Sequence, residues 1–250
     1  MRLLVSDLYK VAKSRILWLH IGIPIGVVVL FCAYYSYSPW EETDKVILFF
    51  QSIARGFPMI AGIVVTMLYT MDQKAGNYQN LLLYAGGRWK VHVANLITLL
   101  LFAFGSMMIA TIAFKIGFSI IGFSTGTILQ MLYLGALCFL YAVSLYLLQY
   151  IICYILGSGP SLTIGILGTL FSVLIYPGKE DFLWKITPCM HGVRMIAYKA
   201  CRILRPELSS NYSNDYKYGD IWIAGTVLVL TVCFLIFASV WQGNGKAVEE

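Results

Sequence analysis

Ile221–Trp241 reads IWIAGTVLVLTVCFLIFASVW, a stretch of 21 residues without one charged side chain. The hydrocarbon core of a bilayer is about 30 Å thick, and a helix of about 20 apolar residues crosses it. Five further apolar stretches precede this one, and all but the last of them reach that length: 16–35, 50–70, 93–112, 132–153 and 161–176. Inside a bilayer every backbone polar group must be satisfied within its own segment, so each stretch is expected to be a helix. The pattern predicts an all-α polytopic membrane protein with six transmembrane helices.

The composition supports the same class. Hydrophobic residues make up 59% of the chain and charged residues 12%, which is about half the charged share of a soluble domain. The net charge of +6 is therefore expected to sit in loops near lipid head groups, not to bind nucleic acid. The longest hydrophilic segment, 177–220, is too short for a soluble domain. We expect residues 1–250 to form a single transmembrane domain.

The orientation follows from the basic residues in the short flanks of the spans, because cytoplasmic loops carry an excess of Lys and Arg. One side holds seven of them: Arg2, Lys10, Lys13, Arg15, Lys74, Arg88 and Lys90. The short loops of the other side hold only Lys45 and Lys115. Both termini are therefore predicted to face the cytoplasm.

The first fifteen residues carry an amphipathic pattern. Leu3, Leu4, Leu8 and Val11 recur at helical spacing, which predicts a short N-terminal helix lying in the head-group layer. A disordered polar lead with a few leucines is the alternative.

The segment 71–90 is predicted to be a cytoplasmic elbow. Tyr78, Leu81, Leu82 and Ala85 are spaced as one face of a helix, and the Gly86-Gly87 pair favours a helix end. The following residues suit membrane-interface anchors: Arg88, Trp89 and Lys90. A flat helix with one apolar side would dock a soluble partner, whereas the alternative is an ordinary loop.

The segment before the last span is predicted to re-enter the membrane from outside. The fifth stretch has sixteen residues, or about 24 Å of helix, which is less than the hydrocarbon thickness. The outer segment 177–220 then contains an apolar patch at 182–184 and a helix-like amphipathic run at 190–204. Both are expected to be interfacial on the outer face.

Arg55 is the only formal charge well inside a predicted span. Five residues beyond Phe50 place it about 7.5 Å deep, shallow enough for its side chain to reach the interface. Two interpretations remain open: a residue of a substrate path or gate, or a snorkelling or paired residue. The acidic residues that could pair with it are Glu41, Glu42 and Asp44.

The motifs of several enzyme classes are missing from the sequence. It contains no G-x-x-x-x-G-K-[ST] loop and no H-E-x-x-H, and His20, His92 and His191 stand in unrelated segments. We therefore expect no catalytic residue, no bound cofactor and no metal site in this chain.

Three motifs stand out in the sequence: Lys10-x-x-Lys13-Ser14-Arg15 before Ile23-Pro24, Asp72-x-x-x-Gly76-x-Tyr78-x-x-Leu81-Leu82 before Arg88-Trp89-Lys90, and Leu183-Trp184-Lys185-Ile186-Thr187-Pro188. With the six predicted spans they resemble the type-2 ABC exporter permease family, and more closely the lantibiotic-immunity permeases of Gram-positive bacteria (the nisin and mutacin immunity type). The sequence departs from the family at Asp72, where many relatives carry Glu, and at Cys189-Met190-His191, where an aromatic–small pair is common.

The resemblance implies a permease subunit whose partners are a cytoplasmic ABC ATPase dimer, which binds ATP and Mg, and a second permease subunit, identical or homologous. The cargo would be a cationic antimicrobial peptide, expelled from the cell membrane to give immunity or resistance. The residues implied to couple to the ATPase are Asp72, Gly76, Tyr78, Leu81 and Leu82. The candidates for a substrate path or gate are Arg55, Trp184, His191 and Arg194.

Other functions remain as alternatives. A permease of another small-molecule or lipid ABC exporter fits the same spans. The membrane subunit of a vitamin importer would have no need of the long outer segment. An intramembrane enzyme or sensor would require paired polar residues within spans, and the sequence does not point to any.

Overall fold

The computed structural model describes residues 2–84, 86–174, 183–211 and 214–242, and every regular element in these ranges is helical. In chain order the helices are α1 (Arg2–Ala12), α2 (Arg15–Tyr35), α3 (Glu42–Lys74), α4 (Gln79–Leu82), α5 (Arg88–Ile120), α6 (Ile128–Leu156), α7 (Ser158–Leu174), α8 (Leu183–Ile186), α9 (Pro188–Leu204), the 3₁₀ turns η1 (Pro206–Asn211) and η2 (Asn214–Tyr218), and α10 (Gly219–Val240). The all-α prediction is confirmed for these residues.

Five of the described helices are long and apolar enough to cross a bilayer, namely α2, α3, α5, α6 and the segment Tyr216–Val240 that contains α10. Helix α7 is also apolar but has only 17 residues, about 25 Å of length. These helices support the prediction of a polytopic membrane protein, while a sixth crossing by α7 stays a prediction.

The two longest helices extend well beyond the apolar stretches that predicted them. Helices α3 and α5 each have 33 residues, or about 50 Å, because their polar ends remain helical. Helix α3 begins at Glu42 and not near Phe50. Arg55 thus lies thirteen residues, about 20 Å, along the helix, and its depth in the bilayer stays a prediction.

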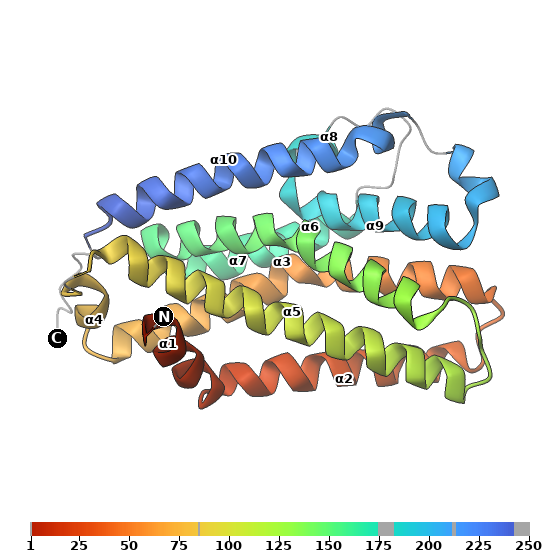
Figure 1. Cartoon of the computed structure of the whole chain (residues 1–250), viewed down its shortest axis with the longest axis horizontal. Helices are drawn as coiled ribbons and strands as arrows, with labels where there is room; N and C mark the ends of the chain where they lie inside the picture. Colours follow the sequence, from red (N-terminus) through yellow and green to blue (C-terminus); the bar gives the residue numbers. More distant parts are fainter. Residues whose placement is uncertain (1, 85, 175–182, 212–213, 243–250) are drawn as a thin grey trace.

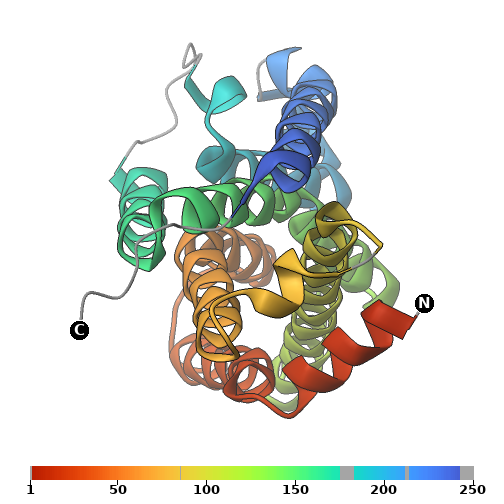
Figure 2. The same ribbon diagram turned by 90° about the vertical axis from the view of Figure 1, so that its left-hand side faces the viewer.

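The long helices run side by side as a bundle, with α1, α4 and the last turn of α10 gathered at one end (Figure 1). We call this the elbow end, and the other the opposite end. Helix α2 packs mainly on α5, whereas α3 contacts α6, α7 and α9. Figure 2 shows α1 lying across the elbow end, where it packs against α5 and α2.

Helix α9 is a core element and not a surface helix. It packs along α3 and α6, and eleven of its residues are buried, including both His191 and Arg194. This corrects the expectation of an interfacial helix at 190–204. Residues 175–182, which include the start of the predicted outer segment, lie outside the described residues.

Small residues bring α7 close to α3. A Cβ on Gly165 would stand 2.8 Å from the carbonyl oxygen of Pro58, and one on Gly168 would stand 3.1 Å from the Pro58 ring. Next to them the Ser161 hydroxyl meets the Gln149 amide of α6 at 2.8 Å. Small residues and interhelical hydrogen bonds are how helices associate tightly in lipid.

Candidate coupling site at the elbow

Asp72, in the last turn of α3, is the centre of a partly buried polar network. Its Oδ2 accepts hydrogen bonds from Tyr154 Oη of α6 at 2.7 Å and from Asn95 Nδ2 of α5 at 3.1 Å. Its Oδ1 forms an ion pair with Lys10 of α1. The Asp72 side chain is only 11% exposed. We call these four residues the Asp72 network; they tie one carboxylate to three other helices.

A second carboxylate, that of Asp7, lies beside the network on α1. The Asp7 side chain is 9% exposed, and its Oδ2 has no hydrogen-bond partner among the described residues. Burial raises the pKa of Asp7 from its ordinary 3.8 to about 6; the positive charge of Lys10 opposes the rise and the charge of Asp72 adds to it. The Asp7 pKa therefore reports on how tightly α1 is packed over the elbow.

The elbow backbone turns sharply after α3. Gly76, Asn77 and Tyr78 all have positive φ, at 109°, 48° and 64°. Left-handed conformations are costly for residues other than glycine. The turn is held by the Tyr78 N–H, which donates to the Asp72 carbonyl at 3.2 Å, and by the Asn77 N–H, which donates to Gln73 at 2.8 Å. The network and the turn thus share Asp72.

Aromatic rings fix the elbow to the last helix. The Tyr78 ring lies 5.4 Å from the Trp241 ring, edge to face, and 5.4 Å from the Tyr69 ring. Trp241 Nε1 in turn donates to the Tyr154 carbonyl at 2.8 Å. Such aromatic pairs stabilise beyond their buried area by about 1 kcal/mol. The elbow, α6 and the end of α10 are therefore in direct contact.

Arg88, at the other end of the elbow, binds the end of α10. Its Nη1 donates to the Trp241 carbonyl at 2.9 Å, just beyond the last residue of α10. A cation at a helix C-terminus satisfies a free carbonyl and the negative end of the helix dipole. Five residues of the site also line a cavity of about 750 Å³ that runs between α1 and the elbow: Asp7, Lys10, Asp72, Tyr78 and Asn95.

Comparison with known proteins identifies the group to which this bundle belongs. Residues 3–176 match the family described as ABC-2 family transporter protein, a range that contains the whole Asp72 network. The chain belongs to the ABC-2 transporter family. No curated protein matches the chain. No solved structure matches it either.

Membership makes the chain the membrane subunit of an ABC-2 type transporter. The family implies that an ATPase partner supplies the energy and that the subunit itself is embedded in the membrane. Such a subunit is generally not catalytic, in keeping with a sequence that has no nucleotide-binding loop.

The ABC-2 subunit presents a different elbow surface from the one predicted. Tyr78 and Leu81 are 3% and 2% exposed, so they pack inside the chain and do not form an exposed docking face. The elbow helix α4 is a single turn, because the positive φ of Asn77 and Tyr78 interrupts the helical run. Leu83 is 79% exposed, and the turn at 73–77 is exposed throughout. Gly76 lies in that turn, Leu82 is half-buried and Asp72 points into the network.

The anchors predicted for the next span divide into two kinds. Trp89 is 45% exposed, and the Lys90 ammonium lies 5.7 Å from its ring centre, as suits interfacial residues. Arg88 instead bonds the end of α10.

Three of the residues expected along a substrate path are packed against other side chains in the part of the chain that the structure describes. Trp184 is 3% exposed and stacks on Tyr216 with ring centres 5.2 Å apart, and Arg194 Nη1 donates to the same Tyr216 hydroxyl at 3.3 Å. His191 is fully buried and bonds the Lys185 carbonyl at 3.1 Å. The structure thus brings Trp184 and Arg194 together around Tyr216 in a packed cluster.

Arg55 lies apart from that cluster and is not paired as expected. Glu41 and Asp44 form ion pairs with Arg205, and Glu42 accepts hydrogen bonds from the Ser124 and Thr125 amides. The guanidinium of Arg55 forms no ion pair with any described residue, and its Nε is buried. Its carbonyl accepts from Ser172 of α7 at 3.5 Å.

Three members of the coupling site were not found from the sequence: Asn95, Tyr154 and Trp241. Asn95 carries a usable signal, since a polar residue within an apolar span is expected to face the protein interior. In the sequence, nothing distinguishes Tyr154 and Trp241 from aromatic residues that lie at a membrane interface. Their roles depend on which helices become neighbours.

Proposed function

We propose that the chain is the permease subunit of an exporter that expels a cationic antimicrobial peptide of the lantibiotic type, powered by a separate ATPase. The family membership supports the exporter architecture. The proposal that the cargo is a peptide is based on the motifs at 10–15, 72–82 and 183–188, which resemble those of immunity permeases.

The Asp72 network is the observation that carries the coupling mechanism. A helix or loop of the ATPase would contact the exposed turn at 73–77 and Leu83. A displacement there acts directly on Asp72, which is bonded to α1, α5 and α6. Through Tyr78 and Trp241 it also acts on α10. The ATPase binds ATP and Mg, and this chain transmits the closure of the ATPase dimer to its helices.

The remaining parts of the assembly follow from the same proposal. A second permease subunit, identical or homologous, completes the pathway. The elbow end, where α1 lies and α10 ends, faces the cytoplasm, as the excess of Lys and Arg in its flanks predicts. The segment of α8 and α9, which carries Trp184 and Arg194, faces outside and meets the peptide, and Arg55 is a further candidate for the path.

The test is resistance in a sensitive host. Co-expression of this chain with its ATPase and any second permease should raise the growth-inhibitory concentration of a nisin-type lantibiotic. The matched control replaces the phosphate-binding lysine of the ATPase and should remove the protection at equal membrane abundance. Lack of protection against every cationic peptide tried, together with an altered lipid composition of the outer leaflet, would instead identify a lipid exporter.

A further inference from the structure

An elongated cavity lies inside the bundle, away from the elbow site. It has a volume of about 200 Å³ and lies between α2, α3 and α5, with Tyr146 of α6 at its wall. On α2 its lining runs from Leu19 to Phe31, and on α3 from Ser52 to Val64. Each range covers twelve residue steps, or about 18 Å along the helix axis. The cavity is therefore long and narrow and runs parallel to the spans.

Helices α2 and α3 form a loosely packed side of the cavity. Helix α2 packs extensively on α5 but makes few contacts with α3. Leu19, Ile23 and Val27 on α2 are half-buried, as are Ile53 and Ile60 on α3. An apolar molecule within the bilayer could enter through this seam without crossing a polar barrier.

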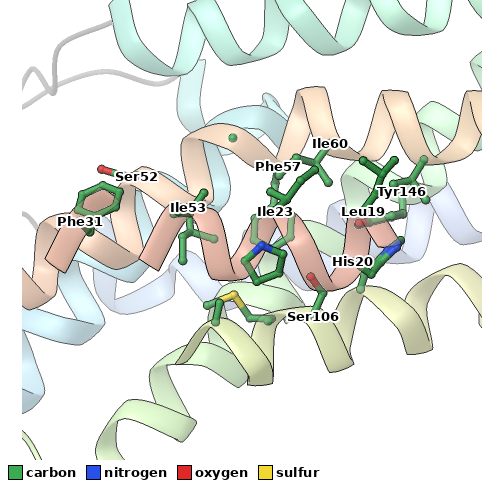
Figure 3. Close-up of a pocket in the computed structure, with 17 residues that line it drawn as sticks. Leu19, His20, Ile23, Phe31, Ser52, Ile53, Phe57, Ile60, Ser106 and Tyr146 are labelled. Carbon is green, nitrogen blue, oxygen red and sulfur yellow. The ribbon is translucent and has the colours of Figure 1, made fainter. Parts of the chain in front are cut away.

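Most of the wall is apolar, but it also holds a few polar side chains, and one of them has a buried atom without a partner. Figure 3 shows Leu19, His20 and Tyr146 toward one end and Phe31 with Ser52 at the other. His20 is 5% exposed and its Nε2 is buried without a hydrogen bond in the described part of the chain. Ser106 and Tyr146 line the same cavity. Unsatisfied polar groups in an apolar wall cost free energy, and a ligand that bonds them recovers it.

The hydrogen bonds of His20 decide what kind of group it can receive. Its Nδ1 lies 2.8 Å from the Ile16 carbonyl oxygen, and a carbonyl only accepts, so Nδ1 carries the proton. An imidazolium would be costly here, because no carboxylate lines the cavity. The neutral ring then offers Nε2 as a bare acceptor. The complementary ligand group is a donor.

We infer that this cavity binds a membrane-soluble molecule with a long apolar chain and a terminal hydroxyl, whose O–H donates to His20 Nε2. A hydroxyl is favoured over an amide because one oxygen both donates to His20 and accepts from Tyr146 or Ser106. The chain then lies along the apolar wall between Ile23 and Ile60 toward Phe31. The source of the molecule is the surrounding bilayer. This site is distinct from the coupling site and does not depend on which cargo the transporter exports.

Photolabelling of the complete chain in lipid nanodiscs tests the inference. The probe is a long-chain alcohol with a diazirine near the end of its chain, and the matched probe is its methyl ether, which lacks the donor. Cross-links from the alcohol should map to 19–31 and 52–64, and unlabelled hexadecanol should compete with them. Labelling spread evenly over lipid-facing residues, without competition, would overturn the proposal.

Two glycine variants separate occupancy from folding. Gly56 lines the cavity, and a Cβ there meets only the Ile60 side chain at 3.8 Å, so Gly56→Leu should fill the space without displacing backbone. It should lower the competable labelling at least roughly fivefold. Gly22→Leu on α2, where a Cβ meets nothing within 4 Å, should leave the labelling unchanged. Equal labelling in both variants would contradict a site in this cavity.

His20→Phe tests the hydrogen bond itself. It removes the acceptor and keeps a ring, so labelling by the alcohol should fall roughly three- to tenfold, as expected for one hydrogen bond. Labelling by the methyl ether should not change. If the variant weakens both probes equally, or neither, the donor requirement is wrong.

Discussion

The Tyr154 hydroxyl of α6 donates to the Asp72 carboxylate of α3 at 2.7 Å, and the two residues stand 82 positions apart in the chain. Each belongs to the last turns of its helix at the elbow end. Asp72 also supplies the carbonyl that holds the turn at Tyr78. The elbow therefore cannot shift without straining bonds to α6, as the proposed coupling mechanism requires.

The first prediction separates the exposed elbow surface from the buried one. Leu83 is 79% exposed, so Leu83→Asp should leave folding intact but weaken association with the ATPase, because a carboxylate must be desolvated at the interface. Leu81 is 2% exposed, so Leu81→Asp should destabilise the subunit itself by several kcal/mol. Co-purification and membrane abundance distinguish them. Normal ATPase co-purification with Leu83→Asp would remove Leu83 from the docking surface.

The second prediction concerns the end of α10. Arg88→Ala removes the hydrogen bond to the Trp241 carbonyl and should destabilise the last turn of α10 by about 1 kcal/mol. Hydrogen exchange of the amides at 236–241 should then be roughly fivefold faster. Lys90→Ala, whose side chain is exposed, is the control. Unchanged exchange in Arg88→Ala would mean that the Trp241 contact to Tyr154 alone holds this end.

The third prediction is a pH dependence carried by Asp7. Its pKa is about 6 in the folded protein, against 3.8 ordinarily, so the folded state binds more protons between these values. The free energy of unfolding contributed by Asp7 therefore falls as the pH rises from about 4 to about 6 and is level above that range. Asp7→Asn should be more stable than the wild type at pH 7.5, with the difference vanishing near pH 4. Thermal unfolding in detergent at both pH values measures it, and a difference independent of pH would contradict the account.

The fourth prediction concerns the contact between α3 and α7. A Cβ on Gly165 would stand 2.8 Å from the Pro58 carbonyl oxygen, so Gly165→Leu must push the helices apart and should cost about 1–3 kcal/mol. Gly22→Leu, in open space on α2, is the matched control. A lower unfolding temperature only for Gly165→Leu is expected; equal temperatures would show that α7 has room to adjust.

Much of the fold could be predicted from the sequence because long apolar stretches permit little besides helices in a bilayer. The stretches located five helices of crossing length, yet the helix ends were missed. Polar ends such as 42–49 of α3 continue the helix, where apolar content carries no signal. Helix α9 was misjudged for a related reason, since its amphipathic pattern suits a membrane surface and a packed protein interior equally well.

The elbow could be located from the sequence, but the direction of its side chains could not. The spacing of Tyr78 and Leu81 correctly marked an apolar face. It could not show that this face turns inward onto Tyr69 and Trp241. Paired polar residues within spans were also invisible: Gln149 and Ser161 are twelve residues apart, and only the turn between α6 and α7 brings them to 2.8 Å.

The most direct test of the account is ATP hydrolysis by the reconstituted transporter with and without its peptide. The wild type should show hydrolysis stimulated by the peptide. Asp72→Asn removes the charge that Lys10, Asn95 and Tyr154 bind but keeps the shape of the side chain. It should retain the bound ATPase and its basal rate while the stimulation falls roughly tenfold, whereas Lys90→Ala, an exposed residue outside the network and outside the turn at 73–77, should keep the stimulation. Full stimulation in Asp72→Asn would contradict the claim that this network transmits the work of the ATPase to the helices.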